Sequence, residues 1–109
     1  EKIIKWSSET IVVPYISPID NRVHRYFVDF IIEYLGKKGE RIVSLIEIKP
    51  KKQCKSPPKR KKLTRSYLNE MKTWEVNKAK WDFARRYAEE RGWEFKIITE
   101  NDILLGKSK

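Results

Sequence analysis

Three charged residues fall where apolar strands are expected. Asp29 lies inside the segment 23–34, and Glu47 and Lys49 lie near the end of the segment 42–49. A charge buried in an apolar strand is costly unless it is paired or bound to a cation. The two carboxylates are hard oxygen ligands of the kind that Mg²⁺ or Mn²⁺ prefers. A divalent metal ion would therefore explain why these acids stand in apolar segments.

The polar stretch 36–40 contains two glycines and is expected to join these segments into an antiparallel hairpin. Because successive side chains of a strand point to opposite faces, Glu47 and Lys49 share a face, and the hairpin can place Asp29 beside Glu47. A lysine there can contact a phosphate or orient an attacking water, so the set favours metal-assisted phosphodiester hydrolysis. The alternative is an ordinary ion pair near a strand end, because short motifs recur by chance.

A strongly basic segment, residues 49–65, begins at Lys49. Nine of its residues are Lys or Arg and none is acidic, whereas the rest of the chain has 16 basic and 15 acidic residues. Pro57 and Pro58 exclude a regular helix, so we expect a flexible basic loop over 50–65 that contacts DNA phosphates. The alternatives are a solvated linker or a nuclear-localisation-like run. The candidate DNA contacts are Lys51, Lys52, Lys55, Lys59, Arg60, Lys61, Lys62 and Arg65.

The remaining elements follow from periodicity. Strands are expected at 3–6 and 10–15, so the first half of the chain is interpreted as an antiparallel meander. A helix is expected over 63–91, with Thr64 as N-cap, Gly92 as C′ residue and a possible break at 73–77. Its apolar stripe, which should pack on the sheet, is Tyr67, Met71, Trp74, Trp81, Ala84 and Ala88. Residues 93–99 are expected to form a last strand, parallel to an earlier one after the helical crossover.

Length and composition indicate one domain over residues 1–109, and a start at Glu1 without methionine indicates a fragment. The single Cys54 excludes an internal disulfide and fits a reducing compartment. No apolar run approaches the roughly 20 residues that span a bilayer, and no signal-peptide pattern appears. His24, the one histidine, could contact DNA or a metal, although such a residue is more often structural. Tyr15 and Tyr26 are interpreted as core or rim aromatic residues.

Asp29, followed at a distance by Glu47-Ile48-Lys49, resembles the core motif of the PD-(D/E)XK nuclease superfamily, with Val28 in place of the motif's proline. The likeness extends over nearly the whole chain. Five stretches resemble the head-completion nucleases of tailed phages and, more distantly, the endonuclease subunit TnsA of cut-and-paste transposons: WSSE (6–9), VPYISPID (13–20), HRYFVDF (24–30), EIKPKKQ (47–53) and FKIITEND (95–102).

The resemblance implies an α/β (α+β) fold with a restriction-endonuclease-like mixed sheet, in which a meander precedes one or two helices and a final strand. It implies an Mg²⁺-dependent DNA endonuclease, with Mn²⁺ as a substitute, that leaves a 5′ phosphate. Asp29, Glu47 and the carbonyl of Ile48 would hold the metal. Lys49 would position or activate the water, and Gln53 would help to hold the site. Lys80 would face DNA, unless it is an ordinary solvated helix lysine.

The implied partners are DNA and phage head or portal proteins, without a membrane, in the host cytoplasm or the virion. A further acidic ligand would lie on a helix preceding Glu1. Two alternatives remain open at this stage. One is a non-catalytic DNA-binding or capsid-associated module, in which the three charged residues form a structural ion network. The other is a TnsA-like transposon endonuclease. Because no base-reading helix is evident, structure- or end-directed cutting is favoured over a fixed recognition sequence.

Overall fold

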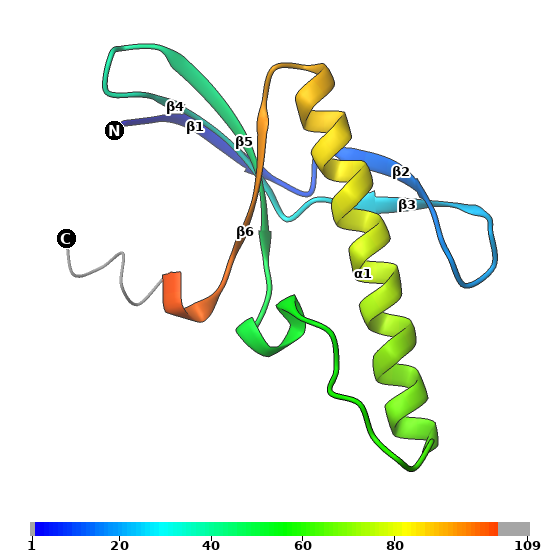
Figure 1. Ribbon diagram of the computed structural model, residues 1–109. Coiled ribbons are helices and arrows are strands. Elements are labelled where there is room, and N and C mark those ends of the chain that lie inside the picture. The colour runs from blue at the N-terminus through cyan, green and yellow to red at the C-terminus, as the bar shows by residue number, and fades with distance from the viewer. Residues whose placement is uncertain (1, 103–109) are drawn as a thin grey trace.

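A computed structural model describes residues 2–102 of the chain (Figure 1). Its main sheet has four strands in the order β1-β4-β5-β6, with bounds Lys2–Ser8, Phe30–Leu35, Arg41–Ile48 and Glu94–Ile98. β2 (Val12–Ile16) and β3 (Val23–Phe27) form a separate two-stranded sheet, here called the ribbon. The short 3₁₀ helix η1 (Lys51–Cys54) and the long helix α1 (Arg65–Glu90) complete the described elements. The predicted α+β architecture with a final strand is confirmed.

The expected single strand over 23–34 is wrong, because the chain changes sheet at Val28 and Asp29. β3 ends at Phe27 and β4 begins at Phe30. Two hydrogen bonds to an earlier segment explain the break: Val28 N donates to the carbonyl of Ile11 at 3.1 Å, and the Asp29 carbonyl accepts from Glu9 N at 3.1 Å. The expected meander is therefore divided between two sheets, and Asp29 stands in a two-residue junction rather than inside a strand.

The predicted hairpin is present as β4 and β5. The strands pair antiparallel with Phe30 opposite Ile46, and Gly36 N donates to the Glu40 carbonyl at 2.7 Å across the turn. Gly39 has φ of +80°, a conformation that glycine adopts without steric cost. The last strand, β6, runs parallel to β5 after the α1 crossover, as expected.

Helix α1 is unbroken through residues 73–77, so the suggested division into two helices is wrong. Both predicted ends are confirmed: Thr64 Oγ1 accepts a hydrogen bond from Tyr67 N at 3.1 Å, and Gly92 has φ of +72°. The buried positions of the helix include Trp81, Ala84 and Ala88. Tertiary packing of this face outweighs the low helix propensity of the Thr73 region.

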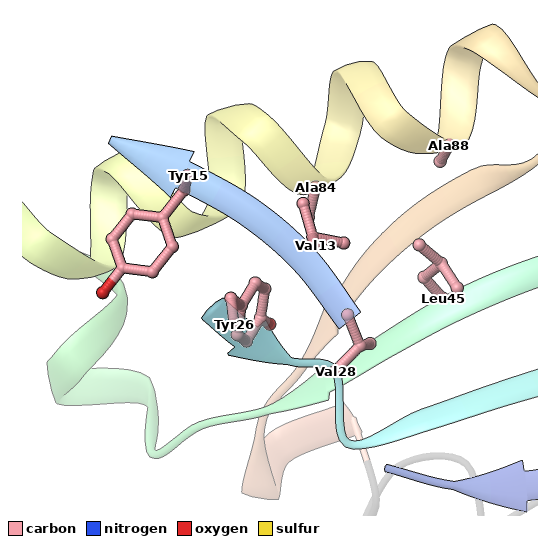
Figure 2. Close-up of a cluster of buried hydrophobic side chains, with 7 residues drawn as sticks. All are labelled: Val13, Tyr15, Tyr26, Val28, Leu45, Ala84 and Ala88. Atoms are coloured by element: carbon pink, nitrogen blue, oxygen red, sulfur yellow. The ribbon is translucent and has the colours of Figure 1, made fainter. Parts of the chain in front are cut away.

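The core lies where the ribbon, the main sheet and α1 meet (Figure 2). Val13 and Tyr26 come from the ribbon, Leu45 comes from β5, and the small side chains of Ala84 and Ala88 let α1 approach closely. The core therefore fixes the ribbon against the end of β5, where Glu47 and Lys49 follow Leu45. No helix among the described residues is long and apolar enough to cross a membrane.

Truncation of Leu45 tests this core. Its side chain is 0% exposed, so Leu45→Ala should lower the free energy of unfolding by about 2–5 kcal/mol through lost contacts and a residual cavity. Leu68→Ala is the matched control, because Leu68 of α1 is 45% exposed. This substitution should lower the free energy of unfolding far less. Urea unfolding followed by circular dichroism measures both; equal losses would contradict the described core.

Candidate active site

The end of β5 places Glu47 on the side of the sheet that faces the ribbon and α1. Glu47 shares this face with Leu45 and is only 5% exposed. Burial raises the pKa of Glu47, and the nearby negative charge of Asp29 raises it further. A hydrogen bond from Tyr26 and the charge of Lys49 act in the opposite direction. The carboxylate is thus held in a poorly solvated position where a cation would stabilise its charged form.

The strand register brings the two predicted acids together. The pairing of β4 with β5 reaches Phe30 and Ile46, so Asp29 and Glu47 are the next residues of the two segments, and the charge of Asp29 raises the pKa of Glu47. The half-buried Asp29 is anchored by its Oδ2 atom, which accepts a hydrogen bond from Ile48 N at 2.9 Å. This bond joins the junction between the two sheets to the last residue of β5. The two carboxylates therefore come from segments far apart in sequence but lie beside one another.

Lys49 lies at the same position. Its Nζ atom is 3.5 Å from Glu47 Oε2, and its side chain is 27% exposed. The Lys49 main-chain N–H donates to the Ile98 carbonyl at 3.0 Å, which continues the parallel pairing of β5 with β6. The backbone of Lys49 is therefore held by the sheet, whereas its side chain is partly open to solvent.

Tyr26 is a member of this site that the sequence did not reveal. It is buried, as expected for a core aromatic residue, and its hydroxyl also donates a hydrogen bond to Glu47 Oε1. The contact depends on the break after β3, which no sequence pattern indicated. Lys80 of α1 also reaches this region, because its Nζ lies 5.6 Å from the centre of the Tyr26 ring.

The donor set fits a hard divalent cation. One oxygen of each acid is held by the protein, Asp29 Oδ2 by Ile48 N–H and Glu47 Oε1 by Tyr26. Asp29 Oδ1 makes no hydrogen bond to a described residue, and Glu47 Oε2 has a 3.5 Å ion pair with Lys49, so a bound cation would compete with Lys49 for that oxygen. Within residues 2–102, no group of three or more His, Cys, Asp or Glu side chains could hold a metal ion. A site here would thus be completed by a backbone carbonyl, water or substrate, which is usual for Mg²⁺.

The other candidates lie around this centre rather than in it. Gln53 is in η1, where its side chain is exposed and makes no hydrogen bond to a described residue. The basic side chains of the 50–65 loop are all exposed. Lys51 N donates to Glu100 Oε1 at 2.8 Å, which links η1 to the turn after β6. His24 of β3 pairs at 2.9 Å with Asp20, which lies in the β2–β3 loop of the ribbon, and this contact supports a structural role.

Comparison with known proteins identifies the family of the chain. A family model described as TnsA-like endonuclease N terminal matches residues 1–100. The chain is 40% identical over 106 residues to the head completion nuclease of Enterobacteria phage T4, covering 94% of this chain and 68% of that protein. No solved structure matches the chain. The chain therefore belongs to the family of TnsA-like endonucleases.

Proposed function

We propose that this endonuclease is a metal-dependent DNA hydrolase whose active site is formed by Asp29, Glu47 and Lys49. The observation that carries the proposal is the pairing of two acids at the junction of the sheets, with an amine 3.5 Å from one of them. That arrangement supplies hard ligands and a positive charge at one point, as hydrolysis of a phosphodiester requires.

In this mechanism Asp29 and Glu47 would hold Mg²⁺, together with the carbonyl of Ile48, and Mn²⁺ would substitute. The bound ion would polarise a phosphate oxygen and favour ionisation of water. Lys49 would orient the attacking water and stabilise the negative charge that develops on phosphorus. Water would attack phosphorus in line as the bond to the 3′ oxygen breaks. A proton from water ends on that oxygen, so the products are a 3′ hydroxyl and a 5′ phosphate. Gln53 would help to hold the site, as the resemblance implies.

The basic loop would hold the DNA. Its eight Lys and Arg side chains from Lys51 to Arg65 are exposed and directly follow the site. Each phosphate that they neutralise releases counterions. Lys80 would contribute from α1, where it is half-buried against the Tyr26 ring. These contacts carry no base specificity, in keeping with cutting directed by DNA ends or structure.

The biological setting is proposed from the relative. A role in phage head completion, with head or portal proteins as partners in the host cytoplasm or the virion, would follow from the name of the T4 protein. A single nuclease domain over residues 1–109 and a further acidic ligand on a preceding helix also remain predictions.

The direct test is plasmid nicking by the purified protein. We expect no cleavage in EDTA and restored cleavage with Mg²⁺ or Mn²⁺, because the reaction needs the ion between the two acids. Cleavage that persists in EDTA would contradict the proposal.

A non-catalytic DNA-binding module is the second candidate, because Lys49 and Tyr26 already give Glu47 two partners without a metal. That candidate predicts DNA binding with no cleavage under any metal.

Tyr26→Phe should weaken Mn²⁺ binding roughly tenfold, as loss of a partner that orients a metal ligand usually does. Burial raises the pKa of Glu47 and the Tyr26 hydrogen bond lowers it, so removing the hydroxyl should raise this pKa further. Because protonated Glu47 cannot bind a cation, the acid-side loss of Mn²⁺ binding should move to higher pH. Calorimetric titration over a pH series measures both effects.

Tyr15→Phe is the control, because Tyr15 is also buried in the ribbon and makes no hydrogen bond to Glu47. It should bind Mn²⁺ as the unmodified protein does. Equal affinities for the two variants would show that Tyr26 does not position Glu47.

A further inference from the structure

A large cleft separates the basic loop from the N-terminal half of α1. Its volume is about 1050 Å³. One wall is the segment that leaves η1 and runs beside the helix, and the other is α1 itself (Figure 1). Gln53 lines this cleft four residues after Lys49, so the cleft opens next to the proposed active site. Apart from Arg65, the residues of the helix wall have no role in the proposed hydrolysis.

Asn77 and Trp74 are the distinctive residues of that wall. Asn77 is 5% exposed, it lines the cleft, and its side-chain amide makes no hydrogen bond to any described residue. The one side-chain polar atom among the described residues that is fully buried without a partner is Trp81 Nε1, so the Asn77 amide atoms are not sealed from solvent. An amide at the wall of a cleft that makes no protein hydrogen bond can bond to water or to a ligand. One turn earlier, Trp74 is half-buried, with Trp81 packed edge-on against it at 6.1 Å between ring centres. Lys78 Nζ lies over the Trp74 ring, 5.6 Å from its centre, so a base would stack on the opposite face or displace the Lys78 side chain.

The net positive charge of the cleft favours an anionic ligand. Four basic side chains line it, and Glu70 is the acid among its lining residues. The basic members are Lys52, Lys55, Arg60 and Arg65. A positively charged groove combined with an aromatic stacking surface is the usual composition of a site for single-stranded nucleic acid. An amide can additionally bond to the edge of an exposed base.

We propose that this cleft binds an unpaired stretch of the DNA substrate, with a base stacked on Trp74 and its edge bonded to Asn77. The inference rests on the proposed function, because the strand so held would lead directly to Lys49. It assigns a substrate class, DNA with a single-stranded end or tail, and gives α1 a binding role beyond its contribution to the core. On this proposal a blunt duplex would contact the basic side chains but would present no unpaired base to Trp74 and Asn77.

Asn77→Leu provides the sharpest test, since it keeps the side-chain size and removes the unpaired amide. Its melting temperature should be equal or higher, because no protein partner is lost. Fluorescence anisotropy in EDTA should show about tenfold weaker binding of a tailed duplex and of an oligothymidylate, with blunt-duplex binding nearly unchanged. Trp74→Leu should show the same pattern, at a size set by the loss of one base stack.

Trp6→Leu is the matched control, because Trp6 is exposed on β1 outside the cleft, and it should leave all three affinities unchanged. Equal losses on blunt and tailed DNA, or a marked fall in the melting temperature of Asn77→Leu, would overturn the proposal. Because binding is measured without metal, failure of the cleft proposal is distinguishable from failure of plasmid nicking.

Discussion

Glu47→Gln should lower the rate of metal-dependent cleavage by roughly a thousandfold, since several kcal/mol of transition-state stabilisation are lost with a metal ligand. The substitution keeps the side-chain size and leaves an amide oxygen that can still accept the Tyr26 hydrogen bond. Loss of fold is therefore not expected. Asp29→Asn should behave in the same way, and Lys49→Ala should reduce the rate while retaining Mn²⁺ binding. Single-turnover nicking and calorimetry separate these effects.

Glu33→Gln is the matched control for Glu47→Gln. Glu33 is also a buried acid of the main sheet, but it pairs with Arg41 at 2.7 Å and Lys5 at 3.5 Å, away from the junction. Its substitution should reduce stability and leave the cleavage rate of the folded protein within about twofold, because it touches no proposed ligand. Cleavage by Glu47→Gln at the rate of Glu33→Gln would remove Glu47 from the active site.

Replacing Lys59, Arg60, Lys61 and Lys62 with Gln should weaken duplex DNA binding at low salt by roughly tenfold to a hundredfold. The plot of log affinity against log salt should become flatter by about one unit for each lost phosphate contact. These side chains are exposed, so the melting temperature should change little. Anisotropy titrations at several salt concentrations measure the slope.

The pair Lys61 and Lys62 can be compared with Lys37 and Lys38, which are exposed in the β4–β5 turn at the other end of the sheet. Both double variants remove the same charge. A purely general effect of net charge predicts equal slopes for the two, whereas contact by the loop predicts a change for Lys61 and Lys62 only. Equal slopes would therefore show that the loop does not touch phosphate.

The β4–β5 hairpin was predicted from the sequence, and its antiparallel register brings the residues before β4 to the end of β5, where Glu47 lies. The same reasoning failed at Val28 and Asp29. The run from Val23 to Tyr34 has strand composition throughout, and its break is determined by hydrogen bonds to Glu9 and Ile11, which local pattern does not contain. The Tyr26 contact with Glu47 depends on that break and was missed for the same reason.

The junction at Val28 and Asp29 has a mechanical consequence. The ribbon is connected to the acids in two ways: by the chain itself, through Val28 to Asp29, and by the Tyr26 hydroxyl on Glu47. If the ribbon tilted against the main sheet, Asp29 would move with it and Glu47 would lose its hydrogen bond from Tyr26. A partner that bound the ribbon and tilted it would thus alter the distance between the two acids without contacting either one.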